Sequence, residues 1–129
     1  MIFLDTSGIY ALADSRDLHH KEAIQRFESL LESQEQLVTH NYVILESIAL
    51  LQARLGLSQA LKFARESSAF EIEWVSGQLH DSALAALQKS GKRNVSFVDH
   101  VSFLVMKRRS LTTAFAFDPH FKAEGFRLL

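Results

Sequence analysis

Short apolar runs alternate with amphipathic helical segments along the whole chain, and this alternation predicts an α/β protein with a mainly parallel central sheet. The first run, residues 2–4, is followed by Asp5, Thr6 and Ser7, the pattern of a buried strand that ends at a helix N-terminus. The size supports one compact unit, because 129 residues with 47% hydrophobic side chains and ten Phe suit a single packed core. We therefore expect one domain over residues 1–129.

The first half of the chain predicts two helices on either side of a strand. Residues 20–33 place their apolar side chains on one helical stripe, residues 37–39 form a short apolar run, and residues 41–55 form the most apolar helix. Gly56 stands where a left-handed C-cap residue belongs, so this helix should end there, and Ser58 can cap the next one.

The second half continues the alternation. Apolar and acidic residues alternate over 70–74, which predicts a strand exposed on one face at an edge of the sheet. Residues 79–89 and 96–109 predict helices, residues 112–117 a buried strand and residues 126–129 a terminal strand. In such a sheet, ligands bind beyond the carboxyl ends of the strands, and Asp5 lies at one of these ends.

Composition excludes several classes of protein. There is no run of about 20 apolar residues to cross a membrane and no signal-like N-terminus, so we expect a cytoplasmic protein. The absence of cysteine excludes disulfides, thiolate catalysis and Cys-based metal sites. A net charge of −1 neither favours nor excludes binding of nucleic acid.

Four acidic side chains stand alone in strongly apolar stretches: Asp5 in MIFLDTS, Glu46 in NYVILESIALL, Asp99 in VSFVDHVSFLV and Asp118 in FAFDPHF. Burying an unpaired carboxylate costs several kcal/mol, and none of the four has a basic neighbour in the sequence. If the fold gathers them, the natural partner is Mg²⁺ or Mn²⁺, which prefer oxygen ligands. This pattern indicates metal-assisted hydrolysis of a phosphodiester.

Helix capping is the alternative explanation for three of these acids. Asp5 precedes a helix, Asp99 lies three residues after Ser96 as in a capping box, and Asp118 precedes a proline suited to a first helical position. Glu46 lies mid-helix, where capping offers no explanation, although it could emerge on a narrow solvent-facing stripe.

The chain resembles the PIN-domain ribonucleases, and within them the toxins of VapBC-type toxin–antitoxin modules. The resemblance spans nearly the whole chain and rests on FLDTSGIYAL, the acid in VTHNYVILES, SFVDHVSFLVMKRRS and TAFAFDPHFKAEGFRLL, in that order. It implies a three-layer α/β/α sandwich with a short sheet. It also implies a Mg²⁺- or Mn²⁺-dependent endoribonuclease, with one or two ions, that cleaves single-stranded or structured RNA.

The resemblance assigns roles to individual residues. The family's acidic quartet falls on Asp5, Glu46, Asp99 and Asp118, as catalytic residues and metal ligands. Supporting polar positions fall on Thr6, Ser96 and Asn41. We expect Asp5 and Asp99 to be the principal metal ligands, Glu46 to bind through water or orient the attacking water, and Asp118 to complete a second metal position.

Two departures from the family pattern lie near the fourth acid. Ala116 stands where many relatives carry Ser or Thr, so one supporting hydroxyl is missing. Pro119, His120 and Phe121 offer no further acid after Asp118, so we expect the second metal position to be weak or filled only with substrate. His100, beside the third acid, can contact phosphate or simply pack. Basic residues at 89–93 and 107–109 lie near predicted helix ends, where they suit RNA contacts and the helix dipole equally.

The resemblance also implies partners: RNA, a small antitoxin that lays an apolar segment into a groove near the site, and a second copy in a homodimer. The apolar helices at 20–33 and 41–55 offer surfaces for such contacts. One rival reading is a catalytically degenerate PIN-like module that binds RNA or protein. Another is a phosphatase or receiver with an aspartate after its first strand, which the chain disfavours because Asp5-Thr6-Ser7 lacks a DxD motif.

Overall fold

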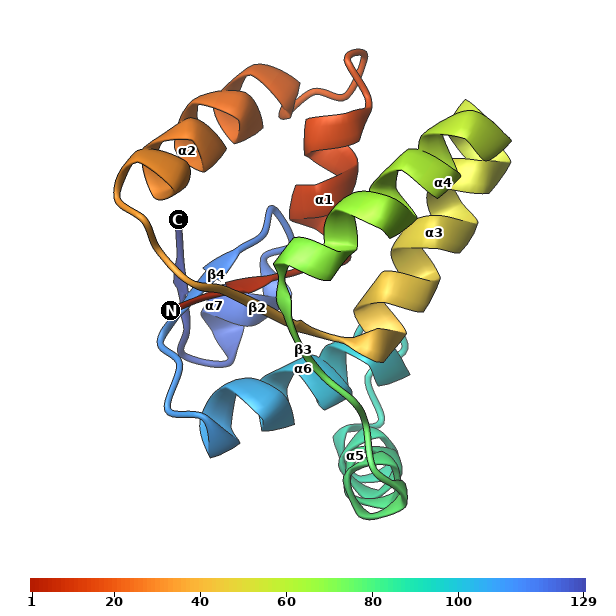
Figure 1. The fold of residues 1–129 in the computed structure, drawn as a ribbon. Coiled ribbons are helices and arrows are strands. Elements are labelled where there is room, and N and C mark those ends of the chain that lie inside the picture. The colour runs from red at the N-terminus through yellow and green to blue at the C-terminus, as the bar shows by residue number, and fades with distance from the viewer.

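The computed structural model describes all 129 residues as a parallel sheet between two layers of helices (Figure 1). The five strands are ordered β3-β2-β1-β4-β5, and every pairing is parallel. Their bounds are β1 Ile2–Leu4, β2 Leu37–His40, β3 Glu71–Glu73, β4 Thr113–Phe115 and β5 Arg127–Leu128. The predicted parallel sheet is confirmed, with the 71–73 strand at its edge.

Helices cover both faces of the sheet. In Figure 1, α1 to α4 lie above the strands, and α5 and α6 lie below them. Their bounds are α1 Thr6–Ala13, α2 His20–Glu32, α3 Asn41–Leu55, α4 Leu57–Glu66, α5 Gly77–Ser90, α6 Phe97–Arg108 and α7 His120–Ala123, with one 3₁₀ turn at Ser67–Ala69. This arrangement confirms the predicted three-layer α/β/α sandwich.

The core sits on both faces of β1, the central strand. All three residues of β1 are buried, as expected for a parallel strand covered on both sides. The largest fully buried side chains include Phe3, Phe115 and Phe121, and Phe3 packs against Phe121 with ring centroids 6.2 Å apart. These rings fix the ends of β1 and β4 beside each other.

A glycine allows α1 to start close to β4. At Gly8, an added Cβ would lie 2.5 Å from the carbonyl oxygen of Phe115 and against its ring. The backbone of Asp5 donates to the same carbonyl at 3.2 Å. The first turn of α1 is therefore held against the carboxyl end of β4.

The helix boundary at Gly56 differs in detail from the prediction. Helix α3 does end there, but Gly56 has φ 96° and ψ 168°, outside the left-handed helical region. Leu57, the position expected to make the apolar contact of such a cap, is 58% exposed, and α4 starts at Leu57 without a side-chain cap from Ser58. The backbone of Gly56 donates to the carbonyl of Leu51 at 3.1 Å, and this bond closes the end of α3.

The fourth strand is shorter than the predicted 112–117 segment. It pairs only over Thr113–Phe115: β5 pairs with Thr113 and Ala114, and β1 pairs with Ala114 and Phe115. The backbone of Phe117, beyond the strand, donates a hydrogen bond to the hydroxyl of Ser7 at 3.0 Å.

None of the helices is both long and apolar enough to span a lipid bilayer.

Candidate active site

The four acids predicted from the sequence line one cleft. This cleft has a volume of about 480 Å³ and lies where β1 and β4 end, between α1, α3 and the start of α6. Its walls include Asp5, Thr6, Ser7, Tyr10, Asp17, His19, Glu46, Leu50, Arg54, Ser96, Asp99, Phe117 and Asp118. Residues from distant parts of the chain therefore meet at the carboxyl edge of the sheet, as the topology predicts.

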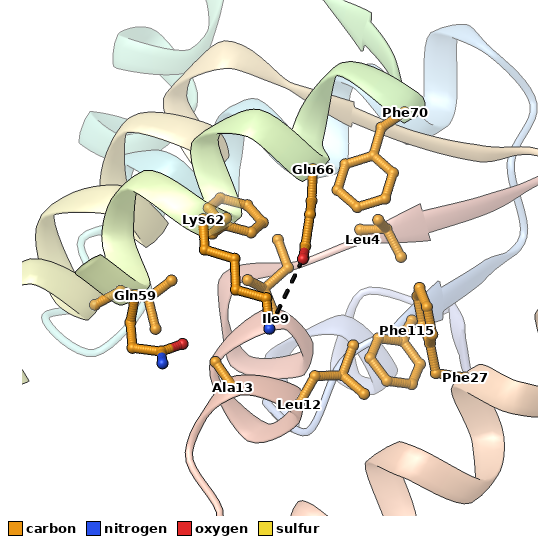
Figure 2. A pocket seen from close by; sticks show the side chains of 12 residues that line it. Leu4, Ile9, Leu12, Ala13, Phe27, Gln59, Lys62, Glu66, Phe70 and Phe115 are labelled. Carbon is orange, nitrogen blue, oxygen red and sulfur yellow. Dashed lines mark ion pairs between the residues drawn. The ribbon is translucent and has the colours of Figure 1, made fainter. Parts of the chain in front are cut away.

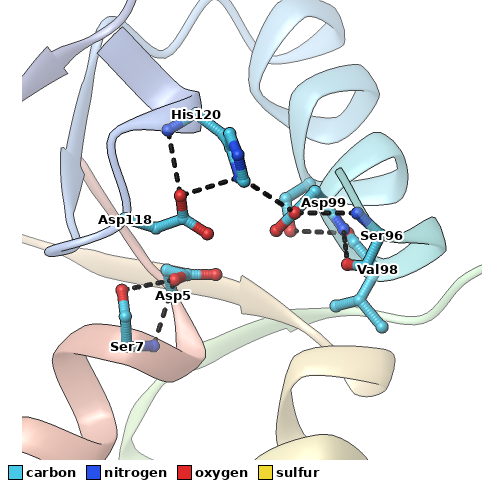
Figure 3. A network of polar contacts seen from close by, with 8 residues as sticks. Asp5, Ser7, Ser96, Val98, Asp99, Asp118 and His120 are labelled. Atoms are coloured by element: carbon cyan, nitrogen blue, oxygen red, sulfur yellow. Dashed lines mark hydrogen bonds and ion pairs between the residues drawn. The ribbon is translucent and has the colours of Figure 1, made fainter. Parts of the chain in front are cut away.

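Asp5 is fixed by Ser7 (Figure 3). Its Oδ2 accepts hydrogen bonds from the Ser7 backbone at 3.0 Å and from the Ser7 hydroxyl at 2.6 Å. The same hydroxyl accepts from the Phe117 backbone at 3.0 Å. Asp5 is the N-cap of α1, so capping and a place in the cleft coincide.

Asp99 is fixed by a capping box. Ser96 Oγ accepts from the Asp99 backbone at 3.1 Å, and Asp99 Oδ2 accepts from the Ser96 backbone at 3.0 Å. Figure 3 shows both bonds at the start of α6. One oxygen of the Asp99 carboxylate is thus used to cap the N-terminus of α6.

Asp118 lies opposite Asp99, with His120 between them (Figure 3). Asp118 Oδ1 accepts from the His120 backbone at 2.9 Å. The ring nitrogen Nδ1 of His120 is 2.8 Å from Asp118 Oδ1 and 3.7 Å from Asp99 Oδ2. This nitrogen is buried and makes no hydrogen bond of good geometry despite the short approach, so it is placed to take another partner.

Burial is the main influence on the ionisation of the site. It raises the pKa of Asp5 from 3.8 to about 7, against the opposing effect of the Ser7 hydrogen bonds. Burial likewise raises the pKa of Asp99, against the hydrogen bonds from Ser96. Repulsion from Asp118 raises both values as a smaller cause, so desolvation outweighs the mutual repulsion that clustering alone suggests.

Glu46 reaches the same cleft from the middle of α3 and is half-buried. Thr6 is buried beside it and accepts a long hydrogen bond of 3.5 Å from Ser47. Asn41 lies elsewhere: its side-chain oxygen accepts from the Val75 backbone at 2.6 Å, and it is not among the cleft residues. The structure thus gathers Asp5, Glu46, Asp99, Asp118, Thr6 and Ser96, and gives Asn41 a contact beyond β3.

The donor set at this end of the cleft fits a divalent cation. Ligand atoms of Asp99, Asp118 and His120 all lie within 4.8 Å of one another. Carboxylate oxygens suit Mg²⁺ and Mn²⁺, and an imidazole nitrogen is better tolerated by Mn²⁺. Sequence reasoning missed His120 as part of the site, although its place two residues after Asp118 was a usable signal.

Comparisons with known proteins agree with this geometry. Residues 2–126 match the family model described as the PIN domain. The chain is 36% identical over 128 residues to the 23S rRNA-specific endonuclease VapC20 of Mycobacterium tuberculosis, covering 98% of this chain and 95% of that protein.

Solved structures show the same fold. The crystal structure of M. tuberculosis VapC20, described as a sarcin–ricin loop cleaving toxin, matches with a TM-score of 0.85 and 35% identity over 98% of this chain and 96% of that one. A DNA-bound VapBC from Salmonella typhimurium matches with a TM-score of 0.64 and 15% identity, covering 100% of this chain and 98% of that one. By family model, sequence and fold, the chain belongs to the PIN-domain family and is a VapC-like member of it.

Proposed function

We propose that the protein is a divalent-metal-dependent endoribonuclease that acts as the toxin of a toxin–antitoxin pair, with residues 1–129 forming its one domain. The observation that carries the proposal is the convergence of Asp5, Glu46, Asp99 and Asp118 on one cleft in a VapC-like chain. The burial of Asp5 and Asp99 makes the charged forms of these two carboxyls costly without a cation, which favours a bound metal over a solvated acidic surface.

The positions support a division of roles among the acids. Asp5 and Asp99 are the most buried of the four acids and are the expected principal metal ligands, while Asp118 is expected to complete a second position. Asp99 lies within ligand reach of Asp118 and His120, so it would be shared between the two positions. Glu46, which makes no direct contact with the other acids, is placed to orient a water molecule. When bound, a divalent ion supplies Lewis-acid activation of water and stabilises charge on the phosphate.

Aromatic and basic side chains at the mouth of the cleft favour a nucleic-acid substrate. The rings of His19 and Phe117 are stacked 4.5 Å apart at an interplanar angle of 10°, and the Arg26 guanidinium lies 5.9 Å from the Phe117 ring centre. Arg54 lies over the Tyr10 ring at 5.2 Å. Bases splayed from a loop can stack on such surfaces, whereas duplex bases cannot reach them.

The relative with 36% identity is named for cleavage of 23S rRNA, so we propose structured ribosomal RNA as the substrate class. The shallow, open cleft suits an exposed RNA loop better than a stiff duplex. Such a substrate places the activity in the cytoplasm.

An apolar groove near the site is our candidate for antitoxin binding. Figure 2 shows it between α1 and α4, with Phe27 of α2 at one end. Its volume is about 220 Å³, and its walls are mainly apolar, with the Lys62–Glu66 ion pair of 4.0 Å at the rim. An apolar antitoxin segment would bury the exposed groove. A homodimer is also expected from the family resemblance.

The test is cleavage of purified ribosomes and total RNA by the wild type and by Asp99→Asn, each with Mn²⁺, with Mg²⁺ and with chelator. Asparagine can keep the capping bond with Ser96, so the variant should fold. The exposed Asp81→Asn on α5 serves as the matched control. We expect discrete RNA cuts only with metal and only from the wild type and Asp81→Asn.

Cleavage by Asp99→Asn at the wild-type rate would refute the assigned site. Metal-independent cleavage would refute the metal requirement. Binding of RNA without cleavage under any metal would favour the degenerate binding module instead.

A further inference from the structure

A basic hollow lies outside the cleft, between the end of α5 and the outer face of α6. Its volume is about 490 Å³, and Lys89, Lys92, Lys107 and His100 are among its walls. On α6, His100 and Lys107 are seven residues apart and so share one helical face. Lys89 stands in the last turn of α5, and Lys92 follows just after the helix ends. Figure 1 shows these two helices side by side below the sheet.

Positive charge in this hollow exceeds negative charge. Lys107 pairs with Glu124 at 3.2 Å, and Glu124 is the one acidic residue in the walls. Lys89 and Lys92 have no acidic group within 4.0 Å, unlike Lys62 and Lys107, which are paired. Two ammonium groups are therefore free to bind an anion.

His100 gives an independent sign that a ligand belongs there. The residue is only 7% exposed, and its ring nitrogen Nε2 is buried with no hydrogen-bond partner. The ring packs edge-on against Phe103, with the ring centroids 5.9 Å apart. A buried polar atom normally has a hydrogen-bond partner. An oxyanion between the lysines would become the partner of Nε2 once the imidazole ring rotates about χ2.

The hollow lies close to the acidic cluster, with a second, smaller space beside it. This neighbouring space of about 140 Å³ shares Lys92 and His100 with the first and is also lined by His120. The Nδ1 of His120 lies 2.8 Å from Asp118 in the acidic cluster. His120 thus stands between the acids of the cleft and the space next to the lysines, and His100 directly follows Asp99 in α6.

We propose that this lysine hollow, defined by Lys89, Lys92, Lys107 and His100, binds a backbone phosphate of the RNA away from the scissile bond. The proposal rests on the proposed ribonuclease function. Lysine contacts to phosphate set the register of a nucleic acid on a protein and carry no sequence information, so the hollow positions the RNA loop for cleavage.

The purely structural alternative is that these cations stabilise helix ends. Lys89 does stand where a cation complements the dipole of α5. That role predicts a lower melting temperature on substitution with unchanged RNA affinity. The two explanations therefore differ in whether substitution of the lysines lowers the affinity for RNA.

The experiment measures RNA affinity against salt concentration in chelator, with Asp5→Asn added to every protein so that no cleavage occurs. The test protein carries Lys89→Gln and Lys92→Gln. The control carries Arg65→Gln on α4 and Arg127→Gln on β5, two exposed residues that line neither the cleft, the apolar groove nor the hollow, and so has the same net charge. The probe is a fluorescent RNA hairpin with a single-stranded loop.

We expect the test protein to bind on the order of tenfold more weakly at 0.1 M salt, with the slope of log K against log salt reduced by about 1.4 for two lost contacts. The control should keep the starting slope. Equal losses in the two proteins, or none in the test protein, would overturn the proposal. An unchanged RNA affinity together with weaker binding of an acidic antitoxin peptide would also overturn it, in favour of a protein ligand.

A second variant and probe separate this proposal from the proposed function. His100→Phe removes the unpartnered nitrogen and keeps the ring packing, so the protein should melt at a higher temperature yet lose binding of inorganic pyrophosphate, followed by NMR. If the wild type binds pyrophosphate and both His100→Phe and the lysine variant lose that binding, the anion site is supported even if the wild type cleaves no RNA. Retained pyrophosphate binding in His100→Phe and in the lysine variant would overturn the site while leaving a cleaving enzyme intact.

Discussion

The buried carboxyl of Asp5 predicts that the metal-free protein loses stability as the pH rises. Its pKa in the folded protein is about 7, against an ordinary value of 3.8. Below pH 4 both the folded and the unfolded state carry the proton, and the group has no effect on stability. As the pH rises from about 4 to 7, the unfolded state loses the proton first, so the folded state becomes relatively less stable.

The size of the effect follows from the two pKa values. The gap between 3.8 and about 7 corresponds to roughly 4 kcal/mol, fully expressed above pH 7. Asp5→Asn removes this cost, because an amide is neutral at every pH and its oxygen can still accept from Ser7. We therefore expect the variant to be more stable than the wild type by several kcal/mol at pH 8 and by little at pH 4.

The assay is urea unfolding in chelator at pH values from 4 to 8 for the wild type, Asp5→Asn and the exposed control Asp81→Asn. Only the difference between the wild type and each variant is interpreted, because every other titrating group is common to them. A constant difference between the wild type and Asp5→Asn across the pH range would show that the folded protein does not raise this pKa.

Three further outcomes follow from other parts of the structure. Metal removal from the wild type should lower its melting temperature more at pH 8 than at pH 5, since protons compete for the buried acids at low pH, and equal losses would contradict this. Gly8→Ala should lower the free energy of unfolding in urea by about 1–3 kcal/mol, because the new Cβ meets Phe115. The control Gly77→Ala should leave it unchanged, because a Cβ at position 77 has no atom within 4 Å. His40 is fully buried, and burial lowers its pKa to about 3. The free energy of unfolding should therefore fall as the pH drops from 6.5 towards 3, and it should fall less steeply with pH in His40→Gln than in the wild type.

The sequence was sufficient for the architecture because periodicity is a local property. Residues 41–55 and 20–32 show a helical pattern that no tertiary contact overrides, and the predicted and observed helices agree closely. The end of β4 was missed because it depends on a distant partner. The strand stops at Phe115, which pairs with Leu4, the last residue of β1, and nothing within residues 112–117 reveals that.

The gathering of the acids was also predictable, since parallel strands deliver their carboxyl ends to one edge. What the sequence could not supply was the conformation of side chains around them. His120 faces Asp99 and Asp118 because the one-turn helix α7 points it back into the cluster, and Asn41 contacts Val75 because the segment after β3 passes beside it. Both outcomes depend on contacts between segments far apart in the chain. The catalytic roles of the acids stay predictions.

Ser7 has a consequence for how the enzyme would release its product. By bonding both Asp5 and the backbone of Phe117, this hydroxyl locks the ends of β1 and β4 into one rigid wall. Asp99 is held from another direction: its carboxylate is bonded to the first turn of α6 and lies 3.7 Å from His120 Nδ1. Helix α6 is itself bonded to the sheet by the buried contact of 2.8 Å between Ser102 and His40, so a product would leave between two walls that are both anchored to the central strands.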